Sequence, residues 1–108
     1  GKEGSAKKIT LPKATTKVTA KAKTDKTVVL SWKKVKGATG YLVYRSTKKN
    51  GSYQRIAVLK KGTKCTYTDK KRLKKGMKYY YRIVTVKKKT YSPAKTTKAV
   101  KIKAAKIK

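Results

Sequence analysis

The stretch Leu73–Val86, LKKGMKYYYRIVTV, decides the fold of this chain. From Tyr79 onward its apolar side chains recur at every second position. Tyr79, Tyr81, Ile83 and Thr85 are expected to face one way, and the residues between them the other way. A period of two predicts a β-strand with one buried face.

The residues just before this strand predict a tight turn. Leu73, Gly76 and Tyr79 follow the spacing L-x-x-G-x-x-Y, and glycine adopts a left-handed backbone without steric cost. A tyrosine placed just after such a turn is typical of a tyrosine corner. Its ring packs inward, and its hydroxyl bonds to the backbone upstream.

Further short strands are predicted on both sides of this stretch. We expect them over residues 14–23 (Val18, Ala20 and Ala22 on one face), 27–32 (Val28, Leu30 and Trp32 inward), 41–46, 53–59 (Ile56 and Val58 inward), 65–68 (Cys65 and Tyr67 inward) and 97–103 (Val100 and Ile102 inward). Asn50-Gly51 predicts a hairpin between the third and fourth strands, and this interpretation is favoured over a glycosylation sequon at Asn50-Gly51-Ser52. About seven strands with turns between them predict an all-β, immunoglobulin-like sandwich.

The charge of the chain is extreme. Its 108 residues include 34 basic and 3 acidic ones, a formal net charge of +31, and only Arg45, Arg55, Arg72 and Arg82 are arginines. Lysine is a compact, hydrated charge, whereas arginine offers the planar fork that reads bases and phosphates. Such a coat keeps a protein soluble and attracts polyanions.

Catalytic and metal chemistry have few candidates. Histidine is absent, the acids are Glu3, Asp25 and Asp69, and Cys65 is the one cysteine. We therefore expect no catalytic residue, no cofactor and no metal site. Asp69 is interpreted as a turn or cap residue, and Cys65 as a small hydrophobe instead of a reactive thiol. No apolar run approaches the length of a membrane span, and no signal-peptide pattern opens the chain.

Three segments together resemble a fibronectin type III domain of the kind found in bacterial surface and secreted proteins. They are Trp32 on the second strand, GYLVYRS at 40–46, and the stretch from Leu73 to Val86. The resemblance implies a seven-stranded sandwich over residues 14–103, with residues 1–13 and 104–108 as linkers. It assigns Trp32, Tyr41, Leu73, Gly76 and Tyr79 to the core and corner, and the alternation adds Tyr81.

This sequence also departs from the family. One extra residue separates Tyr67 from Leu73, Lys75-Gly76 replaces a frequent Pro-Gly, and no Arg-Gly-Asp tripeptide is present. Integrin binding is therefore not carried over. Domains of this family recur as spacers or accessory modules in adhesins and glycan-degrading enzymes, and the fold alone implies no specific activity.

The topology of a sandwich predicts that the basic loops gather at its two ends. One end would collect Lys33, Lys34, Lys36, Lys60, Lys61, Lys64, Lys87, Lys88 and Lys89. The other would collect Lys23, Lys26, Lys48, Lys49, Lys70, Lys71, Arg72, Lys74, Lys75 and Lys78. Because both ends are basic, we expect diffuse, salt-sensitive attraction to a polyanion, with no single shaped groove.

These observations predict a non-catalytic, monomeric spacer or adhesion module that lies beside other domains of its parent chain. The parent protein is expected at the surface or in the wall of a bacterial cell, or secreted from it. Its partners would be anionic polymers such as teichoic acids and acidic glycans. Three alternatives stay open: an accessory module of a carbohydrate-active enzyme, a general binder of DNA or heparin-like polyanions, and a scaffold engineered to carry extreme charge.

Overall fold

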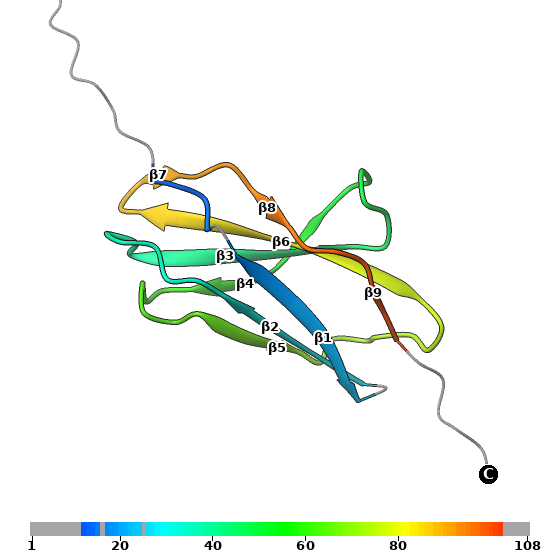
Figure 1. Cartoon of the computed structure of the whole chain (residues 1–108). Helices are drawn as coiled ribbons and strands as arrows, with labels where there is room; N and C mark the ends of the chain where they lie inside the picture. The colour runs from blue at the N-terminus through cyan, green and yellow to red at the C-terminus, as the bar shows by residue number, and fades with distance from the viewer. Residues whose placement is uncertain (1–11, 16, 25, 103–108) are drawn as a thin grey trace, which may run out of the picture.

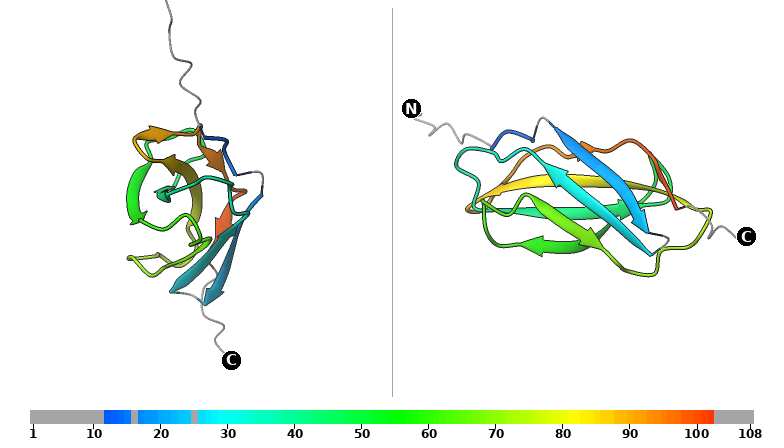
Figure 2. Two further views of the ribbon diagram at one scale, coloured as in Figure 1. Left: turned by 90° about the vertical axis from the view of Figure 1, so that its left-hand side faces the viewer. Right: turned by 60° about the horizontal axis from the view of Figure 1, so that its bottom comes forward.

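Two antiparallel sheets face each other in the computed structural model, which describes residues 12–15, 17–24 and 26–102 (Figure 1; Figure 2, left). The smaller sheet has the order β1-β2-β5, with β1 Val18–Thr24, β2 Thr27–Trp32 and β5 Thr66–Asp69. The larger has the order β4-β3-β6-β7, with β4 Gln54–Leu59, β3 Gly40–Ser46, β6 Lys78–Lys87 and β7 Thr90–Tyr91. Two short segments, β8 Lys95–Thr96 and β9 Val100–Lys101, also pair with β6. The predicted all-β sandwich is confirmed.

The strand β6 alternates as its sequence predicts. Tyr79, Tyr81, Ile83 and Thr85 are buried, and the residues between them are partly exposed. Before the strand, Gly76 has a φ of 81°. The hydroxyl of Tyr79 accepts a hydrogen bond of 2.8 Å from the Lys74 N–H, so the tyrosine corner is present.

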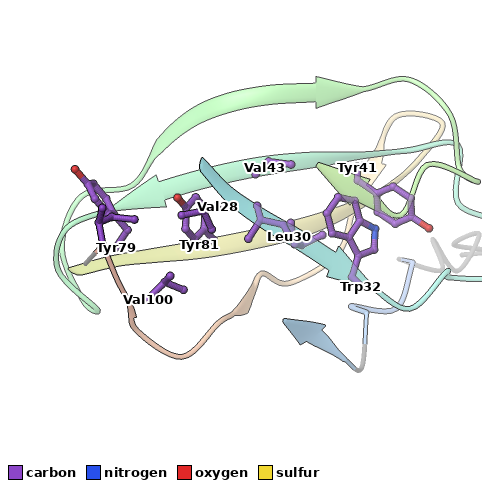
Figure 3. Packing of buried hydrophobic residues seen from close by; sticks show 10 residues of the cluster. Val28, Leu30, Trp32, Tyr41, Val43, Tyr79, Tyr81 and Val100 are labelled. Atoms are coloured by element: carbon purple, nitrogen blue, oxygen red, sulfur yellow. The ribbon is translucent and has the colours of Figure 1, made fainter. Parts of the chain in front are cut away.

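The core runs the length of the sandwich and has aromatic rings near both ends (Figure 3). At one end the rings of Trp32 and Tyr41 meet edge to face, with centroids 5.4 Å apart. At the other end lie Tyr79 and Tyr81. Aliphatic side chains such as Leu30 fill the space between them, and Leu73 of the corner packs against this core half-buried.

The prediction that Val58 points inward is wrong, because β4 contains a bulge. Val43 of β3 pairs with Ala57, but Tyr44 pairs with Arg55, so that Ile56 is an extra residue. The extra residue shifts the alternation by one position. Ala57 and Leu59 therefore pack against the core beside Ile56, while Val58 is 47% exposed.

The predicted strands at the two ends of the chain are shorter than expected. The first begins at Val18 instead of Ala14, and Ala22 is exposed. The last is predicted over 97–103; among residues 97–102, which the structure describes, only Val100–Lys101 (β9) form a strand, and Val100 and Ile102 are nevertheless buried. The expected linkers 1–13 and 104–108 lie outside the described residues, apart from Pro12, which is buried, and Lys13.

Loop 47–53 joins β3 to β4, so the predicted hairpin is confirmed. Its turn differs from a tight Asn-Gly turn, since the Gly51 N–H donates to the Lys48 carbonyl at 3.1 Å. Lys49 and Asn50 thus occupy the central positions, and Gly51 follows them.

Candidate anion-binding surfaces

Loops 33–39, 60–65 and 87–89 converge at one end of the sandwich, which we call the Trp32 end (Figure 1). The Tyr41 hydroxyl donates to the Gly62 carbonyl at 2.9 Å and accepts from the Val35 N–H at 3.1 Å. The Thr39 N–H donates to the Val86 carbonyl at 2.7 Å. These bonds bring together the three loops that carry Lys33, Lys34, Lys36, Lys60, Lys61, Lys64, Lys87, Lys88 and Lys89, all of them exposed.

Close backbone packing holds these loops at the Trp32 end. A Cβ atom added at Gly62 would lie 1.7 Å from the Ala38 carbonyl oxygen, so only glycine fits. Gly37 adopts a φ of 83°, and the side chain of Lys87 passes close to it. The backbone of the loops that carry these lysines is therefore held in one arrangement.

The opposite end, which we call the Tyr79 end, carries loops 47–53 and 70–77 and the turn between β1 and β2 (Figure 1). Its exposed basic residues include Lys23, Lys26, Lys48, Lys49, Lys70, Lys71, Arg72, Lys74, Lys75 and Lys78. The Lys71 Nζ donates to the Ile56 carbonyl at 2.5 Å and is thereby drawn along the sheet. The remaining charges spread around the end.

A buried carboxylate lies beneath the Tyr79 end, and the sequence interpretation missed it. Asp69 is fully buried, and its Oδ2 accepts hydrogen bonds from Tyr81 Oη at 2.7 Å and Arg45 Nη1 at 2.8 Å. Its Oδ1 accepts from the Lys71 N–H at 2.9 Å, which is the expected turn role. The signal was present in the alternation, because Asp69 continues the inward series of Cys65 and Tyr67.

The outward side of the larger sheet has no lysine over the length in which β4, β3 and β6 pair. Where β4, β3 and β6 lie side by side, the outward positions hold Leu42, Tyr44, Arg55, Val58, Tyr80, Arg82, Val84 and Val86. Arg82 also stacks on the ring of Tyr53, with its guanidinium carbon 3.8 Å from the ring centroid. We call this the lysine-free face; it shows that the cationic coat is interrupted.

Cys65, Tyr79 and Tyr81 all lie against the core. Cys65 is half-buried against the core, and its Sγ lies 4.0 Å from the Tyr41 hydroxyl. Tyr79 and Tyr81 are buried, and Tyr80 is partly exposed. Within residues 12–15, 17–24 and 26–102, no group of three or more His, Cys, Asp or Glu residues could hold a metal ion.

A two-sheet sandwich with a buried tryptophan on β2 and a tyrosine corner before β6 defines the class of immunoglobulin-like domains. The model of the fibronectin type III domain family matches residues 12–100, and the chain belongs to that family.

Two relatives are bacterial enzymes. The chain is 40% identical over 78 residues to an amylopullulanase of Thermoanaerobacterium saccharolyticum, a match that covers 72% of this chain and 6% of the enzyme. It is 44% identical over 59 residues to an amylopullulanase of Thermoanaerobacter thermohydrosulfuricus, covering 55% of this chain and 4% of the enzyme. The chain thus corresponds to a small part of each relative.

Solved structures agree with the fold. The crystal structure of an Fn3-like protein from Clostridium thermocellum has a TM-score of 0.73 at 27% identity, covering 91% of this chain and 100% of that one. A two-domain fibronectin type III segment of chicken tenascin has a TM-score of 0.72 at 18% identity, covering 85% of this chain and 51% of that one. This similarity shows the fold alone.

No helix long and apolar enough to cross a membrane occurs in the described part of the chain.

Proposed function

We propose that this domain is a non-catalytic module of a bacterial cell-surface or secreted protein, where it spaces neighbouring domains and holds them near anionic polymers. The observation that carries the proposal is the placement of the lysines. They crowd the Trp32 end and the Tyr79 end, while Asp69, which lies between the sheets, is engaged internally. With 34 basic residues against 3 acidic ones, most of the positive charge has no counter-charge within the chain.

The attraction would be electrostatic and diffuse. Each anionic group that is neutralised releases a counterion, so the affinity falls steeply with salt. At physiological ionic strength the Debye length is about 8 Å, which confines the attraction to close contact. Teichoic acids and acidic glycans satisfy this requirement outside a bacterial cell, and DNA and heparin-like chains share the same electrostatics.

A second candidate is an accessory module of a carbohydrate-active enzyme. It is supported by the two amylopullulanases to which the chain is 40% and 44% identical, since each match occupies a small fraction of a long enzyme. In that role the chemistry belongs to another domain of the parent chain. The lysines would hold the enzyme near the wall, and any glucan contact would be independent of salt.

The test is retention of the domain on matrices of teichoic acid, DNA, an acidic glycan and the neutral glucan pullulan, across a salt series. We expect all three anionic matrices to retain the domain and to release it together as salt rises. Retention by one anionic matrix alone that persists at high salt would contradict diffuse attraction. Retention by pullulan at high salt would favour the accessory-module candidate.

Two triple variants give a matched control. Lys60, Lys61 and Lys64→Gln removes three charges from the Trp32 end, and Lys48, Lys49 and Lys70→Gln removes three from the Tyr79 end; all six side chains are exposed. Diffuse attraction predicts that both variants elute at the same reduced salt concentration. Loss of retention in one variant only would show that a single end binds the polymer.

A further inference from the structure

A hollow of about 330 Å³ opens at the Tyr79 end, between the loop that joins β3 to β4 and the loop that precedes β6. Arg45 and Ser46 line it from the end of β3, and Arg72 and Lys74 line it from the second loop. The hollow is thus built from segments that are far apart in the sequence. It is a defined concave site on a surface for which the distribution of charge alone predicts only diffuse attraction to anions.

The cations of this hollow are unusual for the chain. Only four of its 34 basic residues are arginines, yet two of them, Arg45 and Arg72, line the same hollow beside Lys74. No acidic residue is among the described residues that line it, since Asp69 lies behind Arg45. Arginine presents a planar fork of donors that matches an oxyanion, whereas lysine presents a point charge.

Arg45 can still donate to a ligand. Its hydrogen bonds to Asp69 Oδ2 (2.8 Å) and to the Lys71 carbonyl (2.6 Å) both leave from Nη1. A guanidinium has five N–H donors, and these two hydrogen bonds use neither Nε nor Nη2. The guanidinium also lies over the Tyr79 ring, 5.2 Å from its centroid. The Asp69 carboxylate balances one charge of Arg45 and fixes the orientation of its plane, while Arg72 and Lys74 leave the hollow positive.

The wall that carries Arg72 is held in place on both sides. On one side Lys71 donates its N–H to Asp69 and accepts from Arg45 through its carbonyl. On the other side the Lys74 N–H is bound by the Tyr79 hydroxyl. Between these anchors Arg72 adopts a φ of 50°, a left-handed conformation that is rare for residues with a side chain and persists where the surroundings impose it. A wall fixed before binding loses little entropy on binding.

We propose that this hollow binds one oxyanion carried on a hydroxylated molecule, either the phosphate ester of a polyol or the carboxylate of a sugar acid. Arg72 and Arg45 would hold the oxyanion, with Lys74 adding charge. The opposite wall offers Ser52, Thr47 and Gln54, whose side chains donate to and accept from hydroxyl groups. This inference deepens the proposed function, because it assigns part of the anion binding to a defined site.

The experiment is an NMR titration of the domain with four small probes: glycerol 3-phosphate, glucuronate, inorganic phosphate and glucose. Glycerol 3-phosphate represents a polyol-phosphate polymer, and glucuronate an acidic glycan. We expect saturable shifts of amide signals within 45–54 and 71–79 for at least one of these two, with affinity about 2–10-fold tighter than that of inorganic phosphate because of the added hydroxyl contacts. Glucose, which has no charge, is expected to leave the signals in place.

Four variants, in two matched pairs, separate the hollow from general charge. Arg72→Gln should lower the affinity for the organic probe about tenfold or more. Lys33→Gln removes the same charge from the Trp32 end and should change this affinity less than about twofold. Ser52→Ala leaves the charge unchanged and should remove the preference over inorganic phosphate. Thr63→Ala, an exposed hydroxyl at the Trp32 end, is its control.

Three results would overturn the site. The first is amide-signal shifts spread equally over both ends, and the second is an equal loss of probe affinity in Arg72→Gln and Lys33→Gln. The third is inorganic phosphate binding as tightly as the two organic probes. Each probe carries a single anionic group, so its binding does not depend on a polymer. Polymer retention without a response at 45–54 and 71–79 would reject the site and keep the proposed function. A response to the probes at 45–54 and 71–79 without polymer retention would keep the site and reject the proposed function.

Discussion

The Tyr81 hydroxyl donates a hydrogen bond of 2.7 Å to Asp69 Oδ2, and both side chains are fully buried. Asp69 belongs to β5 of the smaller sheet, and Tyr81 to β6 of the larger one. Arg45, from β3, completes the group with an ion pair of 2.8 Å. Two polar contacts to one buried carboxylate therefore join the two sheets at this place.

Replacing Tyr81 by phenylalanine should lower the free energy of unfolding by about 1.5–3 kcal/mol, because a buried carboxylate loses a charge-assisted hydrogen bond. Denaturant unfolding followed by Trp32 fluorescence measures the change. Tyr80→Phe is the matched control, since the neighbouring ring faces outward and should change stability by less than about 0.5 kcal/mol. Equal losses in the two variants would show that the bond contributes nothing.

The same pair predicts how stability depends on pH in alkaline solution. Burial, and after it the hydrogen bond to Asp69, raises the pKa of Tyr81 well above its ordinary value, which is about 10. Above pH 10 the unfolded chain loses this proton while the folded chain keeps it, so the stability that is present below pH 10 declines as pH rises. The stability difference between the wild type and Tyr81→Phe should shrink by about 1.4 kcal/mol for each further pH unit.

Comparing the two proteins at each pH cancels the pH-dependent contributions that both proteins share. Absorbance of tyrosinate in the folded protein provides an independent measurement. A difference in unfolding free energy between the wild type and Tyr81→Phe that stays constant from pH 9 to pH 11 would contradict the raised pKa of Tyr81.

Two tyrosine hydroxyls should differ in what they contribute. Tyr41→Phe leaves two backbone groups without their partner, the Val35 N–H and the Gly62 carbonyl, and should cost about 2 kcal/mol. Tyr79→Phe leaves only the Lys74 N–H, which lies near solvent, and should cost about 1 kcal/mol. Thermal or denaturant unfolding ranks them, and the reverse order would contradict the roles assigned to these hydroxyls.

Two glycines are required for different reasons. Gly62→Ala places a Cβ atom 1.7 Å from a backbone oxygen and should cost about 3 kcal/mol or more, because the loops of the Trp32 end must separate. Gly76→Ala meets nothing within 4 Å and incurs only the strain of its φ of 81°, about 1 kcal/mol. Unfolding curves of both variants test this order. A smaller loss for Gly62→Ala than for Gly76→Ala would mean that the loops at the Trp32 end yield easily.

The regular part of this fold could be predicted from the sequence, because one buried face imposes a period of two. That period placed Val28, Leu30 and Trp32 of β2, and the whole of β6, without further information. It failed at Val58, because the bulge at Ile56 inserts one residue, and the local sequence carries no signal for that insertion. The broken course of the chain after Pro93 depends on pairing with β6, which is likewise a tertiary effect.

The candidate site was predictable only as a distribution of charge. Counting lysines in loops assigns them to two ends, and the loops do lie there. The hollow beside Arg72 was not predictable, because it depends on how loops 47–53 and 70–77 approach each other. Asp69 could have been recognised from its inward position after Tyr67, although its proximity to a turn favoured a local role.

The lysine-free face has a practical consequence for handling the protein. Reagents that acylate or cross-link amines meet no lysine in Gly40–Ser46 or Gln54–Leu59, so they attach at the ends and along other strands. A sensor surface loaded by amine coupling will hold the domain with the flat side of β3 and β4 chemically unmodified. Peptide mapping after exhaustive acetylation should find no added mass on these two strands.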